Sequence, residues 1–417
     1  MSVIIVPKRG KMTSKQVISS ALEQARDKFA YLDEVSLYNQ KKVLNIFANN
    51  RLALRHFNGT DGYGYDDVGR DTLNRVVADI FGAESAIASP MIASGTHALS
   101  LALFGVLRPN DVVLSISGQP YDTLQDIIYK EGIGSLADFG VKFNCIELKE
   151  DGSFNKDQIA EFLQNNKVKM VYIQRSRGYA WRPALTIAQI EDICAFVRNI
   201  QKDAIIFCDN CYGEFVEKRE PTEVGVDYCA GSFIKNIGGG LAPTGGYIAG
   251  RSHLIELVAG RLTAPSIGTE IGSYSYGYRL FYQGIFMAPH VVNQALKTAV
   301  LFSTALTNLG YETLPKANET LSDIVCSVKL GSADKLISFC QAIQSVSPID
   351  GYVTPEPWDM PGYNDQVIMA AGCFVQGASI ELSCDGPIRA PYIAYLQGGL
   401  TLEHGILALE KVLEKLI

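Results

Sequence analysis

Residues 207–251 read FCDNCYGEFVEKREPTEVGVDYCAGSFIKNIGGGLAPTGGYIAGR, and this stretch decides the fold that we predict for the chain. The apolar run 204–207 predicts a buried strand that ends on Asp209, which puts a carboxylate at the edge of a sheet. Lys235 follows 26 positions later, between Ser232 and three consecutive glycines. Because a buried ammonium group is costly unless it is paired or neutralised, a lysine in this apolar setting needs a chemical reason.

Schiff-base chemistry supplies such a reason, since a lysine amine that condenses with an aldehyde is how pyridoxal phosphate enzymes hold their cofactor. A strand-end acid such as Asp209 would keep the cofactor's ring nitrogen protonated, and Ser232 would donate its hydroxyl to the phosphate. Considered singly, Asp209 and Lys235 also fit the role of ordinary charged residues at the protein surface. The pattern S-x-x-K also fits serine acyl-transfer enzymes, but Ser232 precedes a glycine-rich hairpin and a strand at 247–249 rather than opening a core helix.

A second phosphate-binding element is predicted at residues 92–104, IASGTHALSLALF. Ser94, Gly95 and Thr96 open an apolar helix there, and the free backbone amides of a helix N-terminus bind phosphate. The same residues also fit a plain Ser/Thr helix cap without any ligand. We interpret the adjacent His97 as a packing or capping residue.

Chain length and net charge limit the classes of protein to which this chain can belong. A chain of 417 residues with 47% hydrophobic residues predicts two domains with ample cores. The net charge of -7 disfavours a nucleic-acid or anionic membrane surface, and no apolar stretch reaches the length of a membrane span. The first 17 residues hold a short apolar patch rather than a signal-peptide core, so we expect a cytoplasmic protein.

The nine cysteines are an odd number and lie mostly in apolar segments, which favours reduced core thiols. Cys208 and Cys211 form a C-x-x-C pattern, but the chain has no second one and Asp209 lies inside it, so we expect no metal site. Cys211 follows the strand end and is placed to approach the cofactor.

The order of elements predicts an α/β fold with a mostly parallel sheet, whose ligands bind beyond the carboxyl ends of the strands. Helices are expected at 14–50, 71–82, 156–164, 187–200 and 402–416, and strands at 85–89, 112–116, 143–148, 170–174 and 204–209. Long helices with a glycine- and tyrosine-rich link at 268–284 are expected over residues 252–315. They precede a region with strands at 324–330, 366–371 and 378–383 and a helix at 333–345. No G-x-G-x-x-G follows the first strand, which disfavours a nicotinamide-binding domain. We predict a helical arm at 1–56, a large cofactor-binding domain at 57–290 and a small α+β domain at 291–417.

With these residues in place, the chain resembles the fold-type I pyridoxal phosphate enzymes, in particular the cystathionine and methionine lyases and the methionine gamma-lyase-like group associated with aluminium resistance. The resemblance covers nearly the whole chain and is strongest from residue 63 to residue 251. It implies the aspartate aminotransferase-like fold. It also implies that Lys235 forms the Schiff base, that Asp209 holds the pyridinium nitrogen, and that the phosphate lies among Ser94, Gly95, Thr96 and Ser232.

Two tyrosines extend this resemblance. Tyr121, in PYDTL, matches a family tyrosine that stacks on the cofactor and helps to move protons. Tyr63, in a glycine-rich loop at 57–73, matches a tyrosine that reaches the phosphate of the neighbouring subunit. The resemblance therefore implies a homodimer or homotetramer with the site at the subunit interface.

The chain departs from the family pattern where the substrate would be bound. The family's arginine two residues after the loop tyrosine is Tyr65 here, and the segment 174–185 supplies Arg175, Arg177 and Arg182 instead of an Asn-Pro pair. No arginine stands where the family's C-terminal carboxylate-binding arginine is expected, and Arg389 is our substitute because its planar fork suits an α-carboxylate. A surface ion pair is the alternative role for Arg389.

The resemblance implies a carbon-sulfur lyase that releases a thiol, a 2-oxo acid and ammonia from a sulfur amino acid, with Lys235, Tyr121 and Asp209 as catalytic residues. Arg389, Arg177 and Tyr65 are the candidates for binding the substrate. Two other readings stay open: an aminotransferase or aldolase on a small amino acid, and a protein that binds pyridoxal phosphate without catalysis.

Overall fold

The structure is a computed structural model that describes residues 13–360 and 363–417. Its larger sheet has seven strands in the order β1-β7-β6-β5-β4-β2-β3, and only β7 runs against the others. The strands are β1 (Ser85–Ser89), β2 (Val112–Ser115), β3 (Lys142–Cys145), β4 (Met170–Gln174), β5 (Ile205–Asp209), β6 (Tyr228–Ser232) and β7 (Gly246–Gly250). The predicted α/β architecture with a mostly parallel sheet is confirmed.

Helices cover both faces of this sheet. The helices on one face are α3 (Val68–Phe81), α6 (Lys156–Asn165) and α7 (Ile187–Ile200), and those on the other are α4 (Gly95–Val106), α5 (Asp122–Tyr129) and α8 (Ser252–Leu262). Strand β4 contributes Val171 and Ile173 to the first core and Met170 and Tyr172 to the second. Because both faces of the strands are buried, they read as continuous apolar runs rather than as alternating patterns.

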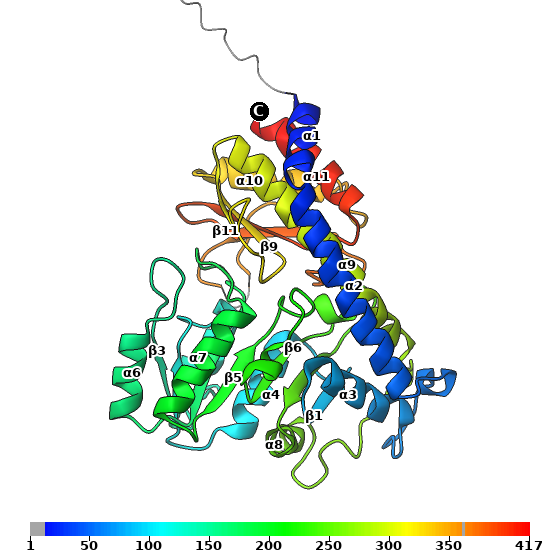
Figure 1. Ribbon diagram of the computed structural model, residues 1–417, viewed down its shortest axis with the longest axis vertical. Helices are drawn as coiled ribbons and strands as arrows, with labels where there is room; N and C mark the ends of the chain where they lie inside the picture. Colours follow the sequence, from blue (N-terminus) through cyan, green and yellow to red (C-terminus); the bar gives the residue numbers. More distant parts are fainter. Residues whose placement is uncertain (1–12, 361–362) are drawn as a thin grey trace, which may run out of the picture.

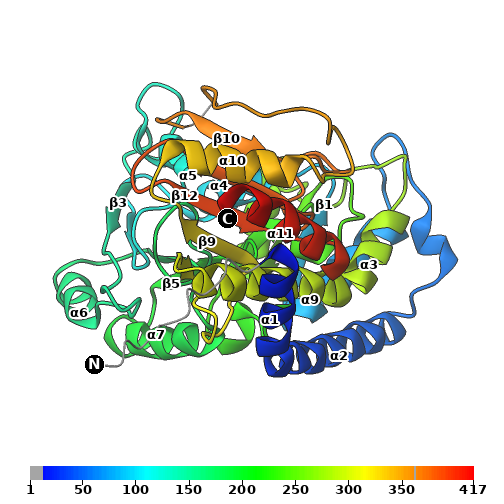
Figure 2. The ribbon, with the colours of Figure 1, turned by 90° about the horizontal axis from the view of Figure 1, so that it is seen from above.

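The second sheet is antiparallel, in the order β10-β11-β12-β9-β8, and lies above the large sheet in Figure 1. Its strands are β8 (Glu312–Leu314), β9 (Val325–Lys329), β10 (Val367–Ala370), β11 (Ser383–Pro387) and β12 (Ile393–Gln397). Helices α10 (Ala333–Gln344) and α11 (Leu402–Leu416) cover its outer face, as the view from above shows (Figure 2).

Side chains alternate across this second sheet. Cys384 and Leu396 join the apolar core on the helix side, whereas their strand neighbours Asp385, Tyr395 and Gln397 belong to the opposite face. These three are buried despite their polarity. The inner face of the sheet therefore carries buried polar side chains beside a small apolar cluster of Val325, Ile393 and Tyr395.

The predicted N-terminal arm consists of α1 (Ser14–Gln24) and α2 (Arg26–Asn49), so the helical prediction for 14–50 is confirmed. Helix α2 packs along α9 (Arg279–Asn308), and the two run side by side in Figure 1. Helix α9 continues through residue 290 without a break, and the boundaries proposed for the three domains stay predictions. Residues 1–12, which carry most of the N-terminal apolar patch, lie outside the described residues.

One predicted strand is wrong. Residues 379–382 form turns and bends, and β11 begins only at Ser383. The Glu381 carboxylate accepts the backbone amides of Phe374 and Val375 at 2.9 Å each, which ties this segment into a turn. An apolar run alone does not reveal such a side-chain-to-backbone contact. Strands β6, β8 and β12 and helix α5 were not predicted.

No helix within residues 13–360 and 363–417 combines the length and the apolar character needed to cross a membrane.

Candidate active site

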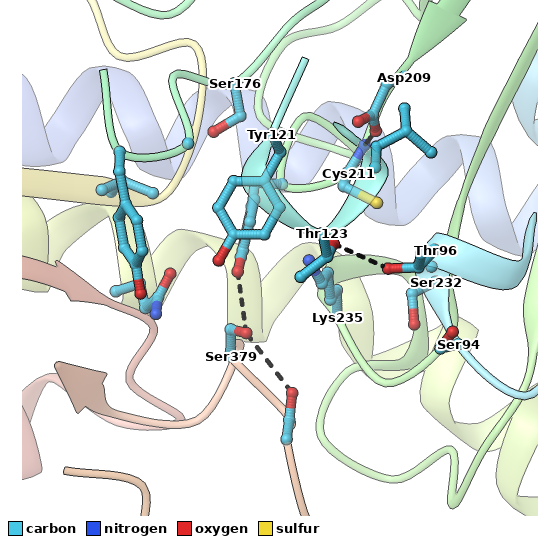
Figure 3. Close-up of a pocket in the computed structure, with 18 of the residues that line it drawn as sticks. Ser94, Thr96, Tyr121, Thr123, Ser176, Asp209, Cys211, Ser232, Lys235 and Ser379 are labelled. Atoms are coloured by element: carbon cyan, nitrogen blue, oxygen red, sulfur yellow. Dashed lines mark hydrogen bonds between the residues drawn. The ribbon is translucent and has the colours of Figure 1, made fainter. Parts of the chain in front are cut away.

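A cavity of about 300 Å³ lies between the carboxyl edge of the large sheet and the polar face of the second sheet. This volume is at the lower end of the range for ligand pockets, about 300–1,000 Å³. Side chains from both sheets line the cavity, among them Ser94, Tyr121, Asp209, Lys235 and Asp385. Figure 3 shows the part that combines residues from α4, α5, β5 and β6. Residues distant in the sequence therefore meet at one place, as the rule for parallel sheets predicts.

Lys235 enters this cavity just after β6, where the chain turns into a short 3-10 helix, Asn236–Gly238. Its Nζ atom lies 3.9 Å from the centre of the Tyr212 ring. Withdrawal from water lowers the pKa of Lys235, but Tyr212, Cys211 and Asp209 together outweigh this effect and leave the pKa above its ordinary value. The amine is thus held as an ammonium group against an aromatic face.

Asp209 ends β5 and is almost fully buried. Its Oδ1 atom accepts the backbone amide of Cys211 at 3.1 Å. Burial raises the pKa of Asp209, while the Cys211 amide and Lys235 act in the opposite direction. A carboxylate in this position is stabilised by a cationic ligand group, which is what a protonated ring nitrogen offers.

The opposite end of the cavity is lined with hydroxyl groups and helix amides. Ser94 caps α4, and its Oγ atom accepts the His97 amide at 3.0 Å. Thr96 Oγ1 and Thr123 Oγ1 lie 3.1 Å apart (Figure 3). A Cβ atom on Gly95 would lie 3.3 Å from Cys211 Sγ and 3.5 Å from Ser232 Cβ, so the helix start and the end of β6 converge here. Hydroxyl donors beside a helix N-terminus suit a phosphate group.

Tyr121 forms a side wall of the cavity. Its backbone amide donates to Gln174 Oε1 at 2.7 Å, and its hydroxyl lies 2.5 Å from that of Tyr363. Gly178 lies so close that an added Cβ would approach the Tyr121 ring to 2.8 Å. Burial and the nearby Asp385 raise the pKa of Tyr121 well above its ordinary value.

The structure does not bring the predicted substrate arginines into the cavity. Arg177 is buried against Asp323, with Nη2 3.2 Å from Oδ1, and it also donates to the Leu314 carbonyl at 2.8 Å. Arg389 lies at the surface and pairs with Asp365 at 2.9 Å. Both guanidinium groups thus have protein carboxylates as partners, and neither side chain lines the cavity.

The loop tyrosines also lie outside this cavity. Tyr63 and Tyr65 are 68% and 63% exposed, and their rings contact each other at a centroid distance of 5.5 Å. They line a separate open depression formed by residues 59–65 and Ser275. Tyr63 and Tyr65 could therefore contribute only to the catalytic centre of another copy of the chain.

Sequence reasoning missed the residues contributed by the second sheet and by the tyrosine-rich turns. Asp385, Gln397 and Tyr395 come from β11 and β12, and Tyr179, Tyr212 and Tyr363 come from connecting segments. Alternating polar residues in SCDGP and IAYLQ signal a polar sheet face, but the alternation does not say that this face is buried.

Comparison with known proteins decides the family. The methionine gamma-lyase family model matches residues 14–417. The chain belongs to the methionine gamma-lyase family. Methionine gamma-lyases are pyridoxal phosphate enzymes, so this member is a pyridoxal phosphate-dependent carbon-sulfur lyase, and the predicted aspartate aminotransferase-like fold is confirmed.

Three similar proteins show how far the likeness to this member of the methionine gamma-lyase family extends. The Bacillus subtilis protein YnbB is 51% identical over 376 residues, which are 89% of each chain. A Clostridium acetobutylicum structure, described as a candidate cystathionine beta-lyase involved in aluminium resistance, is 48% identical with a TM-score of 0.94 over 97% of this chain and 96% of its own. A Clostridium novyi structure, described as a carbon-sulfur lyase involved in aluminium resistance, is 49% identical with a TM-score of 0.93 over 97% and 96%.

Proposed function

We propose that this protein is a lyase of sulfur amino acids that breaks the bond between carbon and sulfur at the β or γ position. The observation that carries the proposal is the single cavity that joins the Lys235 amine, the Asp209 carboxylate and the hydroxyl-lined start of α4. These are the three groups that pyridoxal phosphate requires of a protein: an amine, an acid for the ring nitrogen and donors for the phosphate.

In this proposal Lys235 would hold the cofactor through its amine, and Asp209 would stabilise its ring nitrogen. Ser94, Gly95, Thr96 and Ser232 would hold the phosphate. The bound cofactor supplies an electron sink for the pair left at Cα when a proton is removed. The small side chains at the start of α4 support this assignment, because they leave room at the helix amides.

Three side chains of the protein then carry the steps. With the cofactor bound, the Lys235 amine would take the proton from the substrate Cα and, for a carbon-sulfur bond at the γ position, a second proton from Cβ. The pair of electrons in the carbon-sulfur bond leaves with sulfur, and a proton on the leaving sulfur completes the thiol. Tyr121 is within the cavity and shares a short contact with Tyr363, so this hydroxyl pair is our candidate donor of that proton. Water then converts the remaining product into a 2-oxo acid and ammonia.

We further propose that the active enzyme is a homodimer or a higher oligomer. The exposed aromatic pair Tyr63 and Tyr65 supports this proposal, because large apolar side chains gathered on a surface loop favour a contact. In the oligomer Tyr63 would reach the phosphate in the neighbouring subunit. The proposed location of the enzyme is the cytoplasm.

The decisive experiment measures 2-oxo acid and thiol release from cystathionine, methionine and cysteine, with threonine as a sulfur-free control and without an added amino acceptor. Release of both products identifies a lyase, whereas a requirement for an added 2-oxo acid would identify an aminotransferase. The variant Lys235→Ala should lose both turnover and the borohydride-trapped adduct at position 235. A variant that keeps both would overturn the assignment of Lys235.

A further inference from the structure

Most hydroxyl groups that line the cavity already have a protein partner. The pairs are Tyr121 with Tyr363 at 2.5 Å, Tyr212 with Ser379 at 3.0 Å, Thr96 with Thr123 at 3.1 Å, and Tyr395 with the Tyr179 carbonyl at 2.6 Å. Among residues 13–360 and 363–417, two buried polar atoms of the lining have no partner with hydrogen-bond geometry: the Tyr179 hydroxyl and Asp385 Oδ1. Buried polar groups are nearly always paired, so these two atoms mark a place where a ligand is missing.

Asp385 is held in place by its own sheet. It lies on β11 opposite Tyr395 of β12, is only 9% exposed, and its Oδ2 atom accepts Gln397 Nε2 at 3.3 Å. The Tyr179 hydroxyl approaches the carboxylate closely enough to lower its pKa, yet without the geometry of a hydrogen bond. Within the part of the chain that the structure describes, Oδ1 is therefore buried beside the Tyr179 hydroxyl without a well-formed hydrogen bond.

The charges of the cavity do not balance once the cofactor is considered. Among the described side chains that line it, the cation is Lys235 and the carboxylates are Asp209 and Asp385. The proposed function uses Lys235 and Asp209 for the cofactor, which leaves the Asp385 carboxylate without a counter-charge. A buried carboxylate in this state is costly unless it takes up a proton, which its raised pKa of about 7 favours, or a cation joins it.

Neighbouring arginines do not supply that cation. Arg177 pairs with Asp323, and its Nη1 donates to the Leu314 carbonyl. Arg182 donates from Nη2 to the carbonyls of Gln174 and Ser176 and from Nη1 to that of Pro183. Neither of these two arginines, among the described residues, is available to keep Asp385 ionised, whereas a cationic ligand would do so.

We propose that Asp385 and Tyr179 form a subsite for a positive charge carried by the side chain of the substrate. The inference rests on the proposed function, in which the α-amino group of the substrate is used at the cofactor and is not free to fill this subsite. The cation must then lie beyond the carbon-sulfur bond, as in a thioether amino acid with a distal ammonium group or in a sulfonium amino acid.

The aromatic surroundings suit the same ligand class. The rings of Tyr121, Tyr179 and Tyr363 lie 5.6–6.3 Å from one another by their centroids and line the cavity on the side of Asp385. Aromatic faces attract ammonium and sulfonium groups, and the attraction strengthens when water is excluded. A distal carboxylate at this position would instead face Asp385 and be repelled. The subsite therefore selects against acidic side chains.

Binding of unreactive amino acids tests the charge preference independently of catalysis. Lysine has no carbon-sulfur bond but places an ammonium group at the end of its side chain, norleucine is its uncharged counterpart, and 2-aminoadipate is acidic. Titration calorimetry on the purified holoenzyme should show lysine binding about 10-fold or more tightly than norleucine, with 2-aminoadipate weakest. In Asp385→Asn this preference should vanish while norleucine affinity stays within about 2-fold.

The variant Asp334→Asn, which changes an exposed carboxylate at the start of α10, is the matched control and should keep the preference for lysine. Circular dichroism and the cofactor absorbance of each variant confirm that it is folded and loaded. Equal affinity of the wild-type holoenzyme for lysine and norleucine, or tightest binding of 2-aminoadipate, would overturn the inference. A preference for lysine that persists in Asp385→Asn would overturn the role of Asp385.

Turnover separates this inference from the proposed function. S-(2-aminoethyl)cysteine and S-propylcysteine differ at one end group, ammonium against methyl, and both contain the carbon-sulfur bond. The ratio of their kcat/KM values should favour the cationic substrate in the wild type and approach 1 in Asp385→Asn. If neither releases a thiol while lysine still binds preferentially, the lyase function fails and the cation subsite stands.

Discussion

Lys235 Nζ lies 3.9 Å above the centre of the Tyr212 ring, whose hydroxyl donates to Ser379 Oγ at 3.0 Å. A residue from the edge of the large sheet thus contacts a ring that is anchored to the segment leading into the second sheet. The contact holds the amine between the two layers, where the cavity opens.

The ring of Tyr212 is expected to stabilise the charged form of Lys235. Tyr212→Leu should lower the pKa of Lys235 by roughly 1 unit, because a desolvated cation–π contact contributes about 1–2 kcal/mol and one unit corresponds to about 1.4 kcal/mol. Only the neutral amine reacts with an aldehyde, so cofactor-free Tyr212→Leu should capture pyridoxal phosphate several-fold faster at neutral pH. Stopped-flow absorbance measures this rate. Tyr212→Phe keeps the ring and is the control; equal rates for Leu and Phe would rule out a ring effect.

Removing the charge of Asp209 is expected to lower kcat more than it weakens cofactor binding. Asp209→Asn keeps the size of the side chain but cannot stabilise a protonated ring nitrogen, so kcat should fall by about 100-fold or more, which is about 3 kcal/mol of transition-state stabilisation. The holoenzyme absorbance should persist with a shifted maximum. Steady-state kinetics together with the spectrum test this expectation, and a variant with wild-type kcat would remove Asp209 from the mechanism.

The two predicted substrate arginines should behave differently. Arg177→Met leaves Asp323 buried without its partner and should lower the free energy of unfolding by about 3–5 kcal/mol. Arg389→Met breaks an exposed pair with Asp365 and should cost at most about 1 kcal/mol. Urea unfolding of both variants gives the comparison.

A companion variant makes the Arg177 result interpretable. In Arg177→Met/Asp323→Asn the buried charge is gone, so a large part of the lost stability should return. If Arg177→Met instead unfolds like the wild type and only raises KM, Arg177 binds substrate, as the sequence alone suggested.

Asp385 is expected to make the stability of the protein depend on pH. Burial raises the pKa of Asp385 to about 7, so the folded protein holds this proton over a range in which the unfolded chain has released it. The resulting stabilisation is present in acid and is lost as the pH rises towards 7. The groups that face Asp385 across this range are the Lys235 amine and the hydroxyls of Tyr121, Tyr179, Tyr212, Tyr363 and Tyr395.

Asp385→Asn has no titrating proton at this position. Its free energy of unfolding relative to that of the wild type should therefore rise from pH 5 to pH 8, by on the order of 2–3 kcal/mol. Urea unfolding at the two pH values measures the difference. Parallel behaviour of variant and wild type across the range would show that Asp385 titrates near its ordinary pKa.

Local patterns predicted much of the large sheet. The helix at 187–200 and the strands at 85–89 and 170–174 have the observed bounds, because a capping residue or a continuous apolar run marks each of them in the sequence. The strand that ends on Asp209 and the helix that starts after Ser94 were found for the same reasons. Since parallel strands end at a common edge, the sequence also implied that Ser94, Tyr121, Asp209 and Lys235 face one cavity, and all four line it.

The buried polar side chains on the inner face of the second sheet were not predictable in this way. The sequence predicts no role for Asp385, Tyr395 or Gln397. It predicts Arg177 and Arg389 as substrate-binding residues, with a surface ion pair as the alternative for Arg389. Whether such side chains meet water, a ligand or each other depends on how the second sheet sits over the first, which is a long-range property of the chain.

The sequence by itself determined the parallel sheet and the lysine and acid at its edge, because strand and helix periodicity and strand-end residues are local signals. The family was implied by the resemblance of the sequence to known enzymes. Only the tertiary structure decided which charges remain unpaired inside the cavity. Pairing of buried charges depends on distances between residues far apart in the chain, and these distances arise when the two sheets pack together.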